Sequence, residues 1–285
     1  MIIKLIRKQL KKNFPRLYKK SFKLRSFLFK VLSKKQNINL VSEFFEYTPG
    51  GSGNANLINN NIVYNIKSIS SSLNLLIKER KKIRKFNELS YDSKLANQLM
   101  SSFEKNGSDK HLHKYHLIYS HIFSNYKIES LLEIGMGSND ENILSSMGDY
   151  GVPGGCLKTF SEILDDKAKI VGLDIDKSIL FNERNIQTFY FDQLNLEHIN
   201  TFSHEYSRYF DLLIDDGLHS NVSIINTIYL AKTALKENGI LVIEDIFHEQ
   251  LNYLNIAFNL CRETFEYEIY SMEKTYVIIA NLKHK

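Results

Sequence analysis

From residue 131 onward, short apolar runs alternate with amphipathic stretches along the chain. Five runs have the length and composition of buried strands, at 131–134, 169–174, 186–191, 210–216 and 239–245. Helical spacing at Ile224, Ile228, Ala231 and Leu235 predicts a helix between the last two runs. The runs 265–270 and 276–282 predict a closing β pair. This alternation predicts an α/β fold whose mainly parallel sheet has helices on both faces.

The first hundred residues follow a different pattern. Residues 1–36 interleave cations with apolar residues at roughly helical spacing, and a Gly- and Asn-rich loop covers 49–61. Further helices are predicted over 62–86 and 95–103. We therefore expect two regions, a basic and mainly helical N-terminal region (1–105) and an α/β domain (106–285).

Charge separates the N-terminal arm from the rest of the chain. Residues 1–35 hold thirteen Lys or Arg and no acid, which leaves 24 basic and 32 acidic residues in the remainder. A basic amphipathic helix favours binding to an anionic membrane surface. Packing on the body of the protein is the alternative, and nucleic acid is less favoured.

Cysteine content and apolar run length bear on the compartment. The two cysteines form no paired framework, and no apolar run reaches the length of a membrane span. We expect a cytoplasmic protein, with peripheral attachment to the inner face of the membrane as a further option. The sequence does not determine the oligomeric state, and a homo-oligomer is one option.

The run 131–134 closes on a tight turn, Gly135-x-Gly137. A strand that ends in such a turn is how open α/β sheets seat nucleotide-type cofactors. The dinucleotide fingerprint needs a third glycine where this chain has Asp140, so a nicotinamide or flavin site is disfavoured.

Acids follow the predicted parallel strands. They are Glu133, Asp174, Asp192, the pair Asp215 and Asp216, and the pair Glu244 and Asp245. Because the carboxyl ends of parallel strands share one edge, these side chains should gather where open α/β folds bind ligands. So many carboxylates repel one another unless cations or hydrogen-bond donors compensate. This repetition is the strongest physical signal in the sequence.

Several motifs carry a family resemblance. They are Gly148-x-x-Gly151-x-Pro153-Gly154-Gly155, the runs 172–176 and 188–193, Ile214-Asp215-Asp216-Gly217-Leu218-His219 and Val242-Ile243-Glu244-Asp245. Together with the glycine turn they resemble the class I S-adenosylmethionine-dependent methyltransferases with a Rossmann-like fold. Within that class they are similar to metal-dependent macrolide-sugar O-methyltransferases of the mycinamicin and macrocin type. The resemblance covers about residues 106–285. It departs at 153–158, where the family usually reads Pro-Gly-Ala-Ser-Leu-Arg.

The resemblance implies S-adenosylmethionine as cofactor. Its methionine end would lie at the turn, beside Glu133, Gly135, Gly137 and Ser138. The ribose would bind Asp174, and the adenine would bind Asp192 with Gln193. Asp215 is expected to line the same site.

The resemblance also implies a divalent cation, Mg²⁺ or a similar ion, held by Asp216, Glu244 and Asp245, with Asp216 and His219 as the catalytic residues. Carboxylates with open positions suit Mg²⁺, and a metal-bound hydroxyl loses its proton more readily to an imidazole base. Glu244 and Asp245 are adjacent, so on a regular strand they would point to opposite faces. Both reach one ion only if the strand geometry breaks there.

The implied function is O-methylation of a sugar hydroxyl, in the biosynthesis of a surface polysaccharide, a glycolipid or a glycosylated natural product. The acceptor would be a sugar-containing small molecule or a glycolipid. Two alternatives stay open, a methyltransferase acting on a catechol-like or lipid acceptor and a non-catalytic cofactor-binding module.

Overall fold

The computed structural model of the chain describes residues 81–148, 151–261 and 264–283. The basic arm, the loop 49–61 and most of the helix expected over 62–86 lie outside these residues. None of the described helices is long and apolar enough to cross a membrane.

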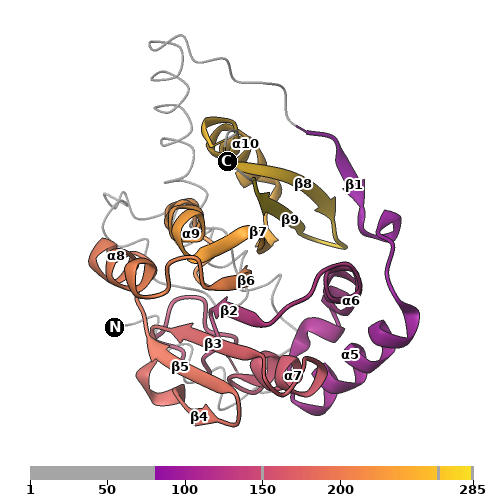
Figure 1. Ribbon diagram of the computed structural model, residues 1–285, viewed down its shortest axis with the longest axis vertical. Coiled ribbons are helices and arrows are strands. Elements are labelled where there is room, and N and C mark those ends of the chain that lie inside the picture. The colour runs from indigo at the N-terminus through magenta and orange to yellow at the C-terminus, as the bar shows by residue number, and fades with distance from the viewer. Residues whose placement is uncertain (1–80, 149–150, 262–263, 284–285) are drawn as a thin grey trace, which may run out of the picture. The chain divides into compact units, whose positions relative to one another are not determined.

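A nine-stranded sheet forms the centre of the described domain, as Figure 1 shows. The strands are β1 (Ile83–Lys85), β2 (Ser130–Ile134), β3 (Lys169–Asp174), β4 (Asn182–Glu183), β5 (Ile186–Tyr190), β6 (Phe210–Asp215), β7 (Leu235–Ile246), β8 (Phe265–Ser271) and β9 (Tyr276–Leu282). Their order is β1-β8-β9-β7-β6-β2-β3-β5-β4. The pairs β7/β6, β6/β2, β2/β3 and β3/β5 are parallel, and β9 runs antiparallel to β7 and β8. The mainly parallel sheet and the closing β pair are confirmed.

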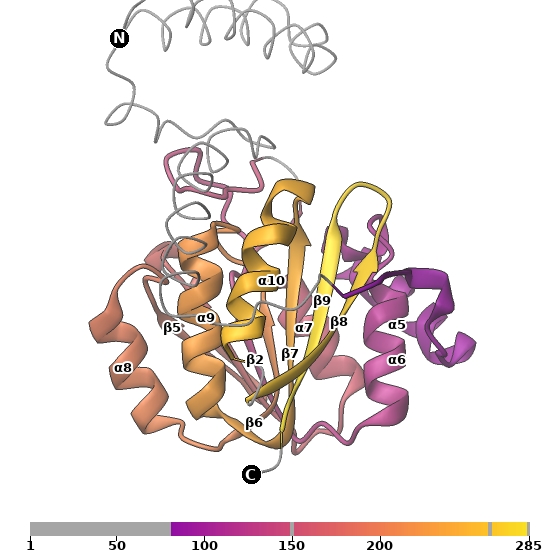
Figure 2. The ribbon, with the colours of Figure 1, turned by 90° about the horizontal axis from the view of Figure 1, so that it is seen from above.

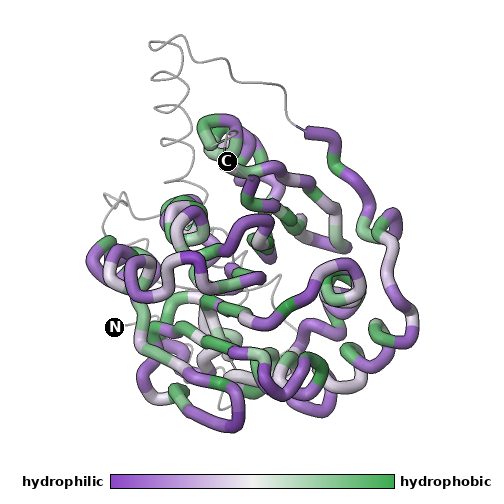
Figure 3. The backbone as a smooth tube through the Cα atoms, in the orientation of Figure 1, coloured by the Kyte–Doolittle hydropathy of each residue, from purple (hydrophilic) through white to green (hydrophobic). Residues whose placement is uncertain are grey.

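Helices cover both faces of the sheet (Figure 2). They are α5 (Ser93–Lys105), α6 (Tyr115–Asn125), α7 (Gly155–Ile163), α8 (Leu196–Glu205), α9 (Asn221–Ala234) and α10 (Leu251–Leu260). Side chains of α5, α6 and α7 belong to one hydrophobic core, and those of α8, α9 and α10 belong to a second. Hydrophobic and hydrophilic residues alternate along α6 and α8 in Figure 3, as expected for helices with one buried side.

The structure differs from the sequence prediction at the start of the described residues. The end of the helix expected over 62–86 is instead the short strand β1, which pairs in parallel with β8. The helix α5, which follows, packs against α6 and α7. Residues 83–105 therefore pack on the α/β domain, and the division expected at residue 105 stays a prediction.

The chain reverses its direction across the sheet at β2. From β2 it proceeds to β3 and β5, and then returns to β6 on the other side of β2. The loops after β2 and β6 therefore leave in opposite directions, and such a switch point is where open α/β sheets bind ligands. Two backbone hydrogen bonds fix the loops there, from Gly135 N to Leu173 O (2.8 Å) and from Asp216 N to Ile134 O (2.9 Å).

Candidate active site

The glycine turn after β2 depends on a close backbone approach. Gly135 has a φ of +90°, and a β-carbon there would lie 2.1 Å from the carbonyl oxygen of Asp216. Gly137 is also left-handed, with a φ of +79°. Only glycine combines this φ with so little space. The turn is therefore built against the loop that follows β6.

Asp174 at the end of β3 holds the same turn. Its carboxylate accepts hydrogen bonds from Met136 N (2.7 Å) and Asp176 N (2.9 Å). Burial raises the pKa of Asp174. Ser138 donates to Asp176 from the other side of the turn. Asp174 and Ser138, both predicted to bind the cofactor, thus lie at the glycine turn.

The remaining predicted cofactor residues have partners within the protein. Asp192 accepts from Leu194 N (2.9 Å) at the start of the next loop. Gln193 is buried, and its Nε2 donates to Asp215 Oδ1 and to Thr227 Oγ1, both at 2.8 Å. Its Oε1 accepts from Leu218 N at 3.0 Å. Gln193 therefore holds the loop after β6, and the contact of Asp192 and Gln193 with adenine stays a prediction.

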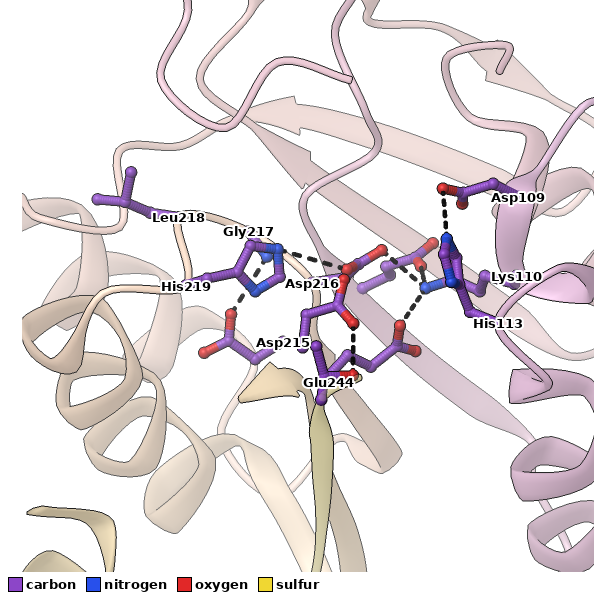
Figure 4. Close-up of polar contacts among 12 residues, drawn as sticks. Asp109, Lys110, His113, Asp215, Asp216, Gly217, Leu218, His219 and Glu244 are labelled. Carbon is purple, nitrogen blue, oxygen red and sulfur yellow. Dashed lines mark hydrogen bonds and ion pairs between the residues drawn. The ribbon is translucent and has the colours of Figure 1, made fainter. Parts of the chain in front are cut away.

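Three groups of metal-ligand type meet at the edge of the sheet. One ligand atom each of Asp216, His219 and Asp245 lies within 4.8 Å of the other two. The side chains of His219 and Asp216 point toward one another in Figure 4. The distance from His219 Nε2 to Asp216 Oδ1 is 3.7 Å. His219 and Asp245 both adopt left-handed backbone conformations, with φ values of +54° and +48°. The expected break in strand geometry is present, because the pairing of β7 with β9 shifts register between Ile243 and Ile246.

Glu244 lies beside this group but is engaged elsewhere. It is 1% exposed, its Oε1 accepts from the Tyr119 hydroxyl, and its Oε2 accepts from Lys110 Nζ at 2.6 Å. Both oxygens of this predicted metal ligand therefore have partners. The group of possible metal ligands in the structure therefore consists of Asp216, His219 and Asp245, without Glu244. The role of Glu244 as a metal ligand stays a prediction.

Lys110 was not among the site residues predicted from the sequence. It lies in the short 3-10 turn η3 (Asp109–His111), which Ser108 caps by accepting from Lys110 N. Its side chain is 3% exposed and reaches Asp216 Oδ2 at 2.7 Å, Glu244 Oε2 at 2.6 Å and Glu133 Oε1 at 3.6 Å. Burial lowers the pKa of Lys110, but the carboxylates of Asp216 and Glu244 outweigh it and hold the pKa well above its usual value. Lys110 is thus a buried ammonium among acids.

Glu133, the acid at the end of β2, has only this cation nearby among the described residues. The buried Cys156 thiol lies beside Glu133, but among the described residues neither carboxylate oxygen of Glu133 has a hydrogen-bond partner within ordinary bonding distance. Burial raises its pKa to about 7, against the opposing effect of Lys110. A cofactor amine or a cation at this edge would meet a buried carboxyl that has unused acceptor capacity.

Asp245 is positioned by α6 and by the β8–β9 turn. Tyr115 donates its hydroxyl to Asp245 Oδ1 (2.8 Å) and accepts from Asp245 N (3.0 Å), and Thr275 Oγ1 lies 3.2 Å from the same oxygen. Together with Lys110 and Tyr119, this gives three side chains from residues 110–119 that contact the acids after β6 and in β7. The signal in the sequence was an Asp-Lys pair just ahead of a helix with two inward tyrosines.

The donor set fits a divalent cation. The carboxylates of Glu133, Asp216 and Glu244 contact Lys110, and Asp245 lies close to Asp216 on the side of His219. Burial raises the pKa of Glu133, Asp216 and Glu244, so a further cation would favour their charged forms, and carboxylate oxygens are the ligands that Mg²⁺ prefers. The residues present therefore suit the ion that the sequence implied.

We compared the chain with protein-family models, curated proteins and solved structures. No protein-family model matches the chain. Mycinamicin VI 2''-O-methyltransferase of Micromonospora griseorubida is 28% identical over 138 residues, 48% of this chain and 32% of that protein. Two crystal structures of the MycE methyltransferase from the mycinamycin biosynthetic pathway, one with Mg and SAH and one with Mg, SAH and Mycinamycin VI, superpose with TM-scores of 0.51 and 0.50. Both are 21% identical to the chain and match 66% of it and 55% of their own length.

The chain thus spans about a third of the length of the curated relative and about half of the solved structures. The shared part is the α/β domain type, with its parallel sheet and helices on both faces. The chain therefore has a Rossmann-like methyltransferase fold like that of MycE, and 138 of its residues are similar in sequence to mycinamicin VI 2''-O-methyltransferase.

Proposed function

We propose that the protein is an S-adenosylmethionine-dependent O-methyltransferase that uses Mg²⁺ or a similar divalent cation and acts on a sugar hydroxyl. The single observation that carries the proposal is the meeting of Asp216, His219 and Asp245 beside the Gly135 turn. A cofactor turn and an acidic group with an imidazole share one edge of the sheet. Methyl transfer to oxygen needs both a seated methyl donor and a base for the hydroxyl proton.

Each residue has a part in this mechanism. The turn and Asp174 seat S-adenosylmethionine, whose sulfonium supplies the methyl group. Asp216 and Asp245 would hold the cation, which lowers the pKa of an acceptor hydroxyl when bound. His219 Nε2, 3.7 Å from Asp216 Oδ1, accepts the proton of a hydroxyl held at Asp216. The fixed backbone around these groups supplies orientation, which accounts for much of the rate in such transfers.

The acceptor class rests on the relative. The curated relative is by name a mycinamicin VI 2''-O-methyltransferase, and one of the similar structures holds Mycinamycin VI. A sugar-containing small molecule or a glycolipid is therefore the proposed acceptor. The proposed settings are the biosynthesis of a surface polysaccharide, a glycolipid or a glycosylated natural product.

The test is turnover of the purified full chain with S-adenosylmethionine and Mg²⁺ against nucleotide sugars, macrolide glycosides and glycolipids. Asp216→Asn should lose activity that excess Mg²⁺ partly restores, while calorimetry still detects binding of S-adenosylhomocysteine. Asp174→Ala should lose that binding. Asp166→Asn, the same change in a surface ion pair whose carboxyl is 88% exposed, is the matched control and should behave as wild type. Full activity in EDTA would reject the metal requirement.

The arm supports a second part of the proposal, attachment to an anionic membrane surface. Residues 1–35 carry thirteen cations and no acid. Deletion of 1–35 should release the protein from anionic liposomes while turnover on a soluble acceptor continues. Binding by the full chain should also weaken with salt, because exposed charges are screened over about 8 Å at physiological ionic strength. Undiminished liposome binding by the truncated chain would contradict this role.

A further inference from the structure

Lys110 is the one lysine of the described residues that is fully buried among acids, and the proposed mechanism gives it no task. Lysine is almost never fully buried unless it is paired. Here the ammonium lies over the ring of Tyr115 at 5.3 Å and contacts three carboxylates. Figure 4 shows Lys110 beside Asp216 and Glu244. The burial of Lys110 therefore needs an explanation, and its effect on the three carboxylates offers one.

The contacts divide the acids into two sets. Glu244 is fully engaged, with one oxygen on Lys110 and the other on Tyr119. Asp216 is half engaged, because Oδ2 accepts from Lys110 while Oδ1 faces His219. Asp216 is also the more exposed partner, with 28% of its side chain accessible against 1% for Glu244. Lys110 therefore ties a buried acid to the acid that faces the candidate metal site.

Two physical effects follow from this arrangement. Without another cation, buried carboxylates this close together are unstable, and Lys110 supplies the compensating charge. When a divalent cation approaches Asp216, the same ammonium lies one hydrogen bond away and repels it. A single side chain thus stabilises the acids in the absence of metal and opposes the binding of metal.

We infer that Lys110 is a resident counter-cation, a positioning residue that keeps the acidic site folded before metal binds and lowers the affinity of the site for that metal. This inference rests on the metal-dependent function proposed above. It also assigns Glu244 first to Lys110, as its ion-pair partner, and leaves Asp216 and Asp245 as the acids open to the metal.

A purely structural role predicts something else. If Lys110 only filled space and paired a charge, its loss would lower stability equally with and without Mg²⁺. Mg²⁺ affinity would then be unchanged, or would fall with the general loss of order. A counter-cation predicts tighter metal binding in the variant that lacks it, which a loss of packing would not produce.

The experiment measures Mg²⁺ binding by calorimetry and the melting temperature with and without Mg²⁺. Lys110→Met keeps most of the side-chain volume and removes the charge. Its metal-free form should melt roughly 6–20 °C below wild type, because an unpaired buried charge costs several kcal/mol. Mg²⁺ should recover most of that loss, and the Mg²⁺ dissociation constant should fall at least about tenfold.

Lys105→Met is the matched control. Lys105 pairs with Glu162 at 2.8 Å on the surface, where its side chain is 69% exposed, so its loss should change neither measurement. If Lys110→Met does not fold, Glu244→Gln is compared with the double variant Lys110→Met and Glu244→Gln, which removes the whole pair. The double variant should bind Mg²⁺ more tightly than Glu244→Gln alone.

The outcomes separate the two proposals. Wild type that binds Mg²⁺, together with Lys110 variants that bind it equally or more weakly, overturns the counter-cation role and leaves the proposed function intact. Wild type that binds no Mg²⁺ overturns the metal-dependent function and this inference together.

Discussion

Gly135→Ala tests the closest backbone approach in the site. The added β-carbon would lie 2.1 Å from the carbonyl oxygen of Asp216 and 2.7 Å from Gly217 Cα, both backbone atoms. An L-residue also pays for the left-handed φ of +90°, about 1–2 kcal/mol. Moving the facing loop adds about 1–3 kcal/mol, the usual cost of overpacking. The expected loss in the free energy of unfolding is about 2–5 kcal/mol.

Gly148→Ala is the matched control, because Gly148 is also left-handed, with a φ of +65°, but a β-carbon there meets no described atom within 4 Å. Gly148→Ala therefore has the cost of the left-handed backbone conformation but no steric clash. Urea unfolding of both variants at equal protein concentration should therefore show Gly135→Ala to be the less stable by about 1–3 kcal/mol. Equal losses would refute the reasoning, since they would mean that the loop after β6 moves aside freely.

Two further predictions concern the base, His219, and Asp211, a partly buried acid at the start of β6. His219→Ala should lose roughly 10²–10⁴-fold in rate while calorimetry still shows binding of Mg²⁺ and S-adenosylhomocysteine; loss of Mg²⁺ binding would make His219 a metal ligand instead. Asp211→Asn should cost about 1–3 kcal/mol at neutral pH, measured by urea unfolding. Burial raises the pKa of Asp211, but Lys236 and the backbone amide of Glu129 outweigh it and hold the pKa below its usual value. The stabilisation is therefore present above the usual Asp pKa of about 4 and is lost as the pH falls through the lower folded value, so an unfolding difference that persists in strong acid would contradict it.

The sequence predicted the sheet well because its signal is local. Runs such as 169–174 and 210–216 are apolar over the length of a strand, and the structure has strands at 169–174 and 210–215. The gathering of acids follows from the fold alone, because parallel strands end at one edge. The break at Asp245 could also be anticipated, since two adjacent side chains reach one place only where the strand geometry ends.

The side chains that contact those acids could not be predicted from local sequence patterns. The burial of Lys110 depends on Asp216 and Glu244, which lie 106 and 134 residues later in the chain. Gln193 shows the same limit. Its amide could face a ligand or Thr227, and only the packing of α9 against the loop decides which. The strand at 83–85 replaced a helix because β8 offers it a free edge.

The separation between Lys110 and its acids has a consequence for synthesis of the chain. At about 5–20 residues per second, Glu244 leaves the ribosome roughly 7–27 s after Lys110, which is 134 residues ahead of it. Until then Lys110 lacks one of the three acids that contact its ammonium. The acidic site is therefore completed late in synthesis, and a nascent chain stalled before β7 would hold Lys110 with Glu133 and Asp216 but without Glu244.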